Sequence, residues 1–142
     1  MEPCLNGDEY EYIITDAVSE LSRGAYSFDD QRLTLSGWSE LESSHVWTLG
    51  KKSTINFNIK DFAAVRRLNL QLMPFGQQNL VVELNGIEVY RGIPSTSRQV
   101  VLPVEGILQQ KNELRLFHPN AIKAGRNDDR GIAFAFRGIE VE

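Results

Sequence analysis

Two tryptophans are the side chains of this chain that are best suited to bind a ligand. Trp38 lies between Gly37 and Ser39, a setting typical of a loop, and Trp47 follows further along. A flat indole face stacks on the C–H surface of a sugar ring, while neighbouring polar groups bond the hydroxyls. Tryptophans also fill the cores of β-sandwich domains, so a packing role stays open for both, with Trp38 the stronger ligand candidate.

The sequence has no arrangement of reactive groups that indicates catalysis. The two histidines, His45 and His118, lack the spacing of a shared metal site, and a structural role at a strand end is favoured for His118. No serine occurs in a Gly-x-Ser-x-Gly elbow. Asp128 and Asp129 are adjacent, which does not give the separation of about 5 Å or more between glycosidase carboxylates. We therefore expect a protein that is not an enzyme.

The cysteine and aspartate content argues against a cofactor. Cys4 is the single cysteine, which excludes an internal disulfide and a four-thiolate zinc site. The Asp128–Asp129 pair is best explained as part of a solvated loop or turn, with a calcium-binding edge as the alternative. We expect no cofactor.

Length and charge restrict the classes of partner. The chain has 142 residues and a formal net charge of -4, with no cluster of Lys and Arg, which argues against nucleic acid. No apolar run approaches the roughly 20 residues that span a bilayer. The start of the chain lacks the basic and apolar segments of a secretory signal, so a cytoplasmic location is expected.

Apolar residues recur at every second position over most of the chain, which is the pattern of half-buried strands. The clearest members of this pattern are Tyr10, Tyr12, Ile14, Leu33, Leu35, Ile55, Phe57, Ile59, Leu68, Leu70 and Leu72. Asn85-Gly86 lies between apolar runs at 80–84 and 87–90, which predicts a hairpin with a type I′ turn. Further strands are expected over 99–102, 113–117 and 131–141.

The parity of the last apolar run changes between Phe136 and Ile139, which predicts a β-bulge near Arg137-Gly138. Short helical turns are expected over 62–66 after Asp61 and over 104–108 after Pro103, with 18–21 a weaker candidate. Residues 119–130 show no strand pattern and are expected to form a long polar loop.

These elements predict an all-β fold, a two-sheet antiparallel jelly-roll sandwich with one or two short helical turns. Turn signals separate the strands, and strands do not alternate with helices. Residues 1–142 are expected to form a single domain, with residues 1–30 completing its edge.

Three short motifs together resemble a family. They are Gly37–Glu42, Val46–Gly50 and Asp128–Phe134. In this order, with an Asn-Gly hairpin between them, they resemble the small β-sandwich module attached to bacterial surface-glycan enzymes, including certain glycosyltransferases and phosphoglycerol-transferase-like proteins. The resemblance covers about 35–141 and leaves the first 30 residues outside it.

The resemblance implies a galactose-binding-like jelly roll that acts as a glycan-binding or structural accessory. Glu42 or Glu40 fills its acidic position, and Asp128 with Arg130 matches its Asp-x-Arg spacing. A structural explanation is equally open, in which Arg130 forms a bidentate pair with Glu42 and joins the two segments.

We therefore predict a noncatalytic carbohydrate-binding module linked to bacterial glycan synthesis or modification. The predicted ligand-binding residues are Trp38, Glu40, Glu42, Asp129 and Arg130. The alternative is a structural or assembly domain that binds a protein partner or a second copy of itself.

Overall fold

The computed structural model describes residues 19–95 and 98–142, and nearly all of its regular structure is β. The strands of the first large sheet, sheet A, are β1 (Glu20–Leu21), β3 (Thr34–Ser36), β5 (Lys52–Ile59), β7 (Leu80–Leu84), β8 (Ile87–Gly92) and β10 (Lys111–Phe117). The strands of sheet B are β2 (Gly24–Ser27), β4 (Val46–Trp47), β6 (Arg67–Pro74), β9 (Val100–Pro103) and β13 (Phe134–Val141). A separate two-stranded sheet consists of β11 (Ile122–Gly125) and β12 (Asp128–Ile132).

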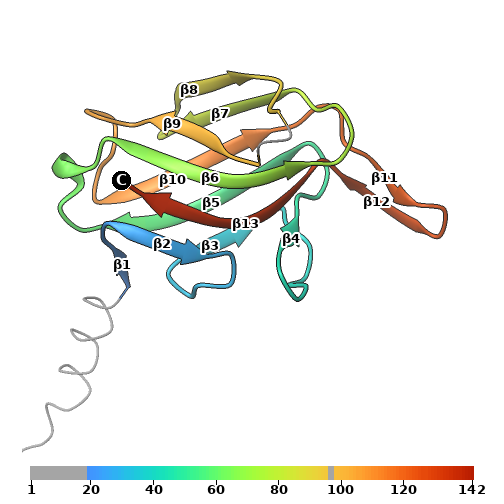
Figure 1. Ribbon diagram of the computed structural model, residues 1–142, viewed down its shortest axis with the longest axis horizontal. Helices are drawn as coiled ribbons and strands as arrows, with labels where there is room; N and C mark the ends of the chain where they lie inside the picture. The colour runs from blue at the N-terminus through green and yellow to red at the C-terminus, as the bar shows by residue number, and fades with distance from the viewer. Residues whose placement is uncertain (1–18, 96–97) are drawn as a thin grey trace, which may run out of the picture.

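In both large sheets, strands that are distant in sequence lie side by side. Sheet A has the order β1-β5-β10-β7-β8, and β3 also pairs with β5. Sheet B has the order β2-β13-β6-β9, and β4 also pairs with β13. The pairings are antiparallel except that of β1 with β5. The predicted two-sheet sandwich is therefore confirmed, and Figure 1 shows the sheets as two layers.

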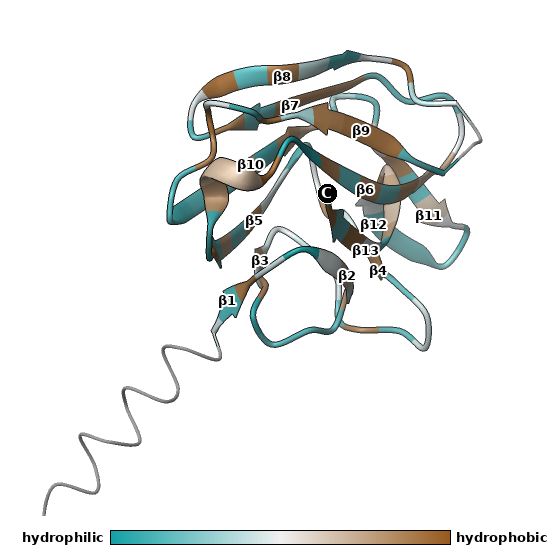
Figure 2. Ribbon diagram, turned by 60° about the vertical axis from the view of Figure 1, so that its left-hand side comes forward, coloured by the Kyte–Doolittle hydropathy of each residue, from teal (hydrophilic) through white to brown (hydrophobic). Residues whose placement is uncertain are grey.

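The core lies between the sheets and is supplied by alternate residues of both. Ile55, Phe57 and Ile59 of β5 face Leu68, Leu70 and Leu72 of β6 in one buried cluster. Figure 2 shows the matching alternation of brown and teal along the strands. This confirms the predicted strands, because apolar side chains at every second position all reach one face.

The β7–β8 hairpin forms as predicted. Asn85 and Gly86 have φ values of 53° and 85°, the positive values of a type I′ turn. The Asn85 amide also bonds the body of sheet A, since Nδ2 donates to Asn112 Oδ1 at 3.0 Å and Oδ1 accepts from Glu113 N at 2.9 Å. Asn85 is a turn residue that fixes the hairpin to β10.

The predicted bulge in β13 is also confirmed. The register with β6 shifts between Phe136 and Gly138, so that Arg137 is the additional residue. Phe136 before the shift and Ile139 after it are both buried. The bulge keeps both halves of the strand on the core and leaves Arg137 exposed.

The predicted short helical turns form. A 3-10 helix, η1 (Phe62–Ala64), follows Asp61, and Val104 O accepts from Ile107 N and Leu108 N, which are the bonds of one helical turn.

Other expectations were wrong or lie outside the described residues. The 18–21 candidate is wrong from 19 onward, because Glu20 and Leu21 form β1. The predicted loop at 119–130 contains β11 and the start of β12. Cys4 and the Tyr10, Tyr12 and Ile14 pattern lie outside the described residues.

The edge expected from residues 1–30 is described from residue 19 onward. There the chain forms β1 along β5 and β2 along β13. The described residues include no helix long and apolar enough to cross a membrane.

Candidate functional site

Three segments meet at one end of the sandwich, at the right of Figure 1. They are the loop 37–50 (the Trp loop), the β11–β12 hairpin and Phe75 after β6. The Trp loop joins the end of β12 through Gly50 N, which donates to Gly131 O at 2.9 Å. Phe75 N donates to Ala133 O at 2.8 Å. Backbone bonds therefore fix the relative positions of the three segments.

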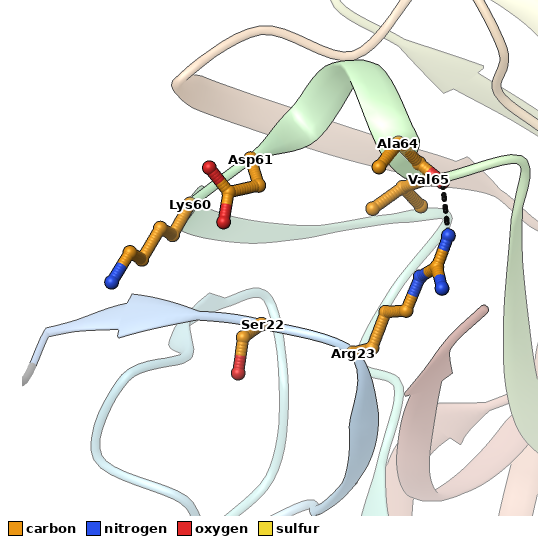
Figure 3. A pocket seen from close by; sticks show the side chains of 6 residues that line it. All are labelled: Ser22, Arg23, Lys60, Asp61, Ala64 and Val65. Carbon is orange, nitrogen blue, oxygen red and sulfur yellow. Dashed lines mark hydrogen bonds between the residues drawn. The ribbon is translucent and has the colours of Figure 1, made fainter.

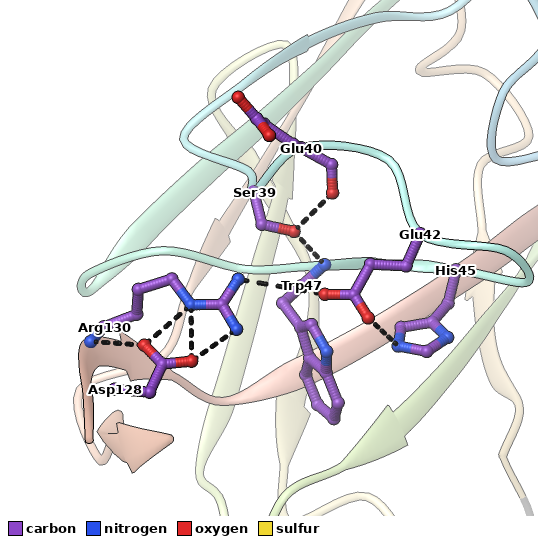
Figure 4. Close-up of polar contacts among 7 residues, drawn as sticks. All are labelled: Ser39, Glu40, Glu42, His45, Trp47, Asp128 and Arg130. Carbon is purple, nitrogen blue, oxygen red and sulfur yellow. Dashed lines mark hydrogen bonds and ion pairs between the residues drawn. The ribbon is translucent and has the colours of Figure 1, made fainter. Parts of the chain in front are cut away.

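The Trp loop is a small hairpin. Trp38 and Thr48 form a β-bridge, Ser39 N donates to Trp47 O at 2.7 Å, and Glu42 N donates to His45 O at 3.0 Å. Ser39 Oγ accepts from Trp47 N at 2.9 Å, a contact drawn in Figure 4. The two tryptophans thus lie on opposite arms of one compact element.

Gly37 starts this hairpin where only glycine fits. Its φ is 81°, and an added Cβ would lie 2.6 Å from Lys52 O. Its carbonyl accepts from Leu49 N at 2.9 Å and from the buried Ser53 Oγ at 2.6 Å. The glycine of the Gly-Trp-Ser motif is thereby explained by backbone geometry.

Thr48 anchors the other arm, a role that the sequence pattern did not reveal. The residue is fully buried, and its Oγ1 accepts from Ala133 N and from Phe134 N at 3.0 Å each. Thr48 N donates to Phe134 O at 2.9 Å. One threonine therefore satisfies two buried donors at the start of β13.

The two indoles have different surroundings. Trp38 packs on Phe136, with ring centroids 5.3 Å apart, and its Nε1 donates to Thr54 O at 2.8 Å. Trp47 is half-buried and touches Phe75 at 5.7 Å and His45 at 5.1 Å, both edge to face. Among the described residues none accepts a hydrogen bond from the Trp47 indole nitrogen. Trp38 is built into the fold, whereas Trp47 keeps an available N–H.

A charged network lies beside Trp47 (Figure 4). Arg130 Nε and Nη2 donate to the Asp128 carboxylate at 2.9 Å and 2.6 Å, and Arg130 Nη1 lies 3.8 Å from Glu42 Oε2. His45 Nε2 lies 3.7 Å from the other Glu42 oxygen. The Arg130 guanidinium holds the pKa of the Asp128 carboxyl below its usual value through these side-chain bonds, and the carboxylate raises the pKa of Arg130.

The proposed bidentate pair between Arg130 and Glu42 needs correction. The bidentate partner is Asp128, and the contact with Glu42 is a longer ion pair. Asp128 lies only two residues away and also accepts from Arg130 N at 3.1 Å, so the local turn geometry decides the pairing. The Glu42 contact still connects the Trp loop with β12.

Glu40 and Asp129 lie outside this network. Glu40 is exposed and points away from Arg130 in Figure 4. Asp129 has a side chain that is 93 % exposed and pairs with Lys123 Nζ at 2.9 Å across the β11–β12 hairpin. Of the five predicted residues, the structure brings together Glu42 and Arg130, and places Trp38 on the core side of the same loop.

His118 is a structural residue at the end of β10, as predicted. It is fully buried, and its Nε2 lies 3.0 Å from the hydroxyl of the equally buried Ser53. That hydroxyl donates to Gly37 O, so the pair supports the base of the Trp loop. Burial lowers the pKa of His118.

A cavity of about 380 Å³ lies elsewhere (Figure 3). Its lining residues are Ser22, Arg23, Lys60, Asp61, Ala64 and Val65. Arg23 Nη2 already donates to Ala64 O at 2.8 Å, and no aromatic ring lines the cavity. It therefore lacks a surface on which a sugar ring could stack.

No group of three or more His, Cys, Asp or Glu side chains is placed to hold a metal ion within 19–95 and 98–142. In particular, no third His, Cys, Asp or Glu side chain of the described residues joins Asp128 and Asp129 in such a group. Asp128 and Asp129 are instead paired with Arg130 and Lys123.

Neither a known protein family nor a curated protein sequence matches the chain. Solved structures do match. An acetyl xylan esterase (Est2A) from the rumen bacterium Butyrivibrio proteoclasticus has a TM-score of 0.54 at 11 % identity, over 86 % of this chain and 32 % of the esterase. A carbohydrate-binding module CBM36 in complex with calcium and xylotriose has a TM-score of 0.52 at 9 % identity, over 83 % of this chain and 98 % of the module.

A second module, the CBM36-1 domain of a multidomain xylanase from the hindgut metagenome of Trinervitermes trinervoides, has a TM-score of 0.54 at 8 % identity, over 83 % of this chain and 94 % of that domain. At these identities the likeness concerns the fold. The chain spans about a third of the esterase but corresponds to nearly the whole of each module. Its fold is the β-sandwich of these two modules.

Proposed function

We propose that this protein is a noncatalytic carbohydrate-binding module and that its ligand lies on Trp47. The observation that carries the proposal is the position of Trp47, which is half-buried beside the network of Arg130, Asp128 and Glu42 and whose indole N–H has no acceptor in the described part of the chain. An aromatic face next to fixed polar groups is the usual composition of a sugar site. The shared fold of carbohydrate-binding modules supports the same function.

In this proposal each group has a separate role. The Trp47 ring stacks on the apolar face of one sugar, and its edge contacts with Phe75 and His45 hold it in place. Arg130 and Glu42 have side chains that are 40 % and 41 % exposed, so both reach hydroxyl groups of a bound sugar. Trp38, Glu40 and Asp129 stay predicted contacts, with Trp38 the most committed to packing.

A titration of glycans tests this site. Trp47→Ala is expected to weaken binding at least about tenfold, because stacked tryptophans dominate the energy of such interfaces. Phe62→Ala is the matched control, since Phe62 is an aromatic residue that is 40 % exposed and lies in η1, outside the Trp loop. If no glycan changes the tryptophan fluorescence or the amide resonances of the wild-type protein, the proposal is wrong.

We further propose that the module serves a bacterial enzyme of surface-glycan synthesis or modification. The three motifs that resemble such modules supply the hairpin start Gly37, the anchor Thr48 and the Asp128–Arg130 pair. Binding of bacterial surface polysaccharides in preference to plant xylans in one glycan array supports this assignment. Preference for xylan contradicts it.

A second candidate, an assembly domain, is favoured by the opposite surface. Strands β8 and β9 lie close together at the top of Figure 1, each at the end of its sheet. Ile87, Ile93 and Val101 there are 47–53 % exposed. An open edge with apolar side chains can pair with another chain. Sedimentation of a dimer that Ile87→Lys dissociates, with glycans inert, favours this candidate over the first.

A further inference from the structure

A second polar hollow lies on the outer face of sheet B. It has a volume of about 230 Å³. Its lining residues are Gln71, Met73, Arg98, Gln99 and Arg137. A volume of this size is below the roughly 300 Å³ at which pockets for whole small molecules begin, so it suits one chemical group of a larger ligand.

Backbone features place both arginines at this hollow. The bulge of β13 makes Arg137 the unpaired additional residue, directed away from the core. Arg98 has a positive φ of 69°, and its carbonyl accepts from Leu72 N at 3.1 Å. Bulges and positive φ values at non-glycine residues are features that commonly direct a functional side chain.

The two guanidinium groups have no carboxylate partner within the described residues. Other arginines of this chain have a carboxylate partner, since Arg91 pairs with Glu88 at 2.8 Å and Arg130 pairs with Asp128 at 2.6 Å. On the outer face of sheet B the carboxylate of β13 is Glu140, which pairs in register with Asn69 and forms no ion pair with either arginine. The hollow therefore carries uncompensated positive charge.

Amide groups complete the polar lining. Gln71 and Gln99 offer donors and acceptors between the arginines. Gln99 is held by the buried Asn69, whose Nδ2 lies 3.4 Å from its Oε1. Two guanidinium groups with neighbouring amides form the chemistry that recognises a carboxylate, sulfate or phosphate group.

The hollow and the Trp47 site lie on the same face of sheet B. Trp47 pairs with Ala135, and Ala135 pairs with Met73, so their side chains share one side of the sheet. Met73 also lines the hollow. Two strand spacings of about 4.8 Å separate Trp47 from Met73, a distance that a short oligosaccharide spans.

We infer that Arg98 and Arg137 form an anion subsite and that the glycan of this module is acidic, with a carboxylate, sulfate or phosphate group. The inference rests on the proposed function, because the anionic group belongs to a sugar chain that also reaches Trp47. The guanidinium groups bond the charged oxygens, while Gln71 and Gln99 bond neighbouring hydroxyls.

An array of paired saccharides tests the inference. Each neutral glycan is printed beside its uronate, sulfated or phosphorylated counterpart, and the best pair is then titrated in solution. We expect the acidic member to bind about tenfold or more tightly, and Arg98→Gln and Arg137→Gln each to remove most of this preference. Arg66→Gln is the matched control, since it removes the same charge at an exposed residue before β6, outside the hollow.

The outcomes separate the two proposals. Equal binding of acidic and neutral members overturns the anion subsite and leaves the carbohydrate-binding function standing. An acidic preference that survives both substitutions also overturns the subsite, because the charge would then be recognised elsewhere. If no saccharide of either kind binds, both proposals fail. Chemical-shift changes at the Arg98 and Arg137 Nε–H groups that occur only with acidic members support the subsite directly.

Discussion

The two arms of the Trp loop use the same residue type for opposite purposes. On the first arm, Trp38 gives its N–H to Thr54 O and its ring to Phe136. On the second arm, the Trp47 indole N–H has no acceptor among the described residues, and its ring meets Phe75 and His45 edge to face. The difference teaches that the partner of the indole nitrogen, more than the exposure of the ring, separates the packing tryptophan from the tryptophan that we propose as the ligand contact.

The largest expected difference separates these two tryptophans directly. Trp38→Ala should lower the free energy of unfolding by about 3 kcal/mol, because it removes a packed ring and leaves Thr54 O without its donor. Trp47→Ala should change the free energy of unfolding by less than about 1 kcal/mol, while it weakens glycan binding at least about tenfold. Urea denaturation measures both variants, and equal losses of stability would contradict the division between the arms.

A somewhat smaller effect is expected at the anchor of the second arm. Thr48→Val keeps the shape of the side chain but removes the acceptor of Ala133 N and Phe134 N. Two buried donors then lack partners, which should cost about 2 kcal/mol. Thr34→Val at an exposed position of β3 is the control, and a Thr48 variant as stable as this control would show that water replaces the hydroxyl.

The stability of the protein should depend on pH through His118, which supports the base of the Trp loop. Burial lowers the pKa of His118 below its ordinary value of 6.5, so below that pH the unfolded chain binds more protons than the folded chain. Stability should therefore be complete above this value and decrease as the pH falls through it toward the folded pKa. His118→Gln should flatten the decrease that sets in as the pH falls below about 6.5, measured by urea denaturation. His45→Gln is the control. If this variant, and not His118→Gln, removed the pH dependence of stability, the prediction for His118 would be wrong.

The smallest effect is expected where the Trp loop meets β12. Glu42→Gln removes the 3.8 Å ion pair with Arg130, which is exposed and screened by solvent. The free energy of unfolding should change by about 0.5 kcal/mol or less, and added salt should remove the change. Glycan affinity should fall more than stability does. A large loss of stability would mean that the ion pair, and not Thr48, holds the loop in place.

Sequence periodicity predicted the sandwich because alternate residues of β5, β6 and β7 are buried on one side. The parity change before Ile139 predicted the bulge for the same reason. Periodicity missed the β11–β12 hairpin, whose strands have mostly exposed side chains and therefore no apolar alternation. Pairing of two polar strands depends on backbone bonds, which leave little trace in side-chain type.

The candidate site was predicted in part. The motifs brought Glu42 and Arg130 together correctly, but the sequence favoured Trp38 over Trp47 as a ligand contact because glycine and serine flank it. The side of the loop on which each indole lies depends on the Trp38–Thr48 bridge, a contact between arms that no local pattern reports. The two arginines at the hollow on sheet B were not singled out, because Arg98 lies in the segment before β9 and Arg137 in β13, so the two are far apart in sequence.

The tip of the Trp loop has a further consequence. Leu41, Glu42, Ser43 and Ser44 are all exposed, whereas the hydrogen bonds to the core come from Gly37, Thr48 and Gly50 at the base. Because no core contact depends on the tip, its length and composition can change without cost to the sandwich. If Trp47 is the ligand contact that we propose, exchange of a few residues at this tip would redirect the domain to another polymer while its folding stayed the same.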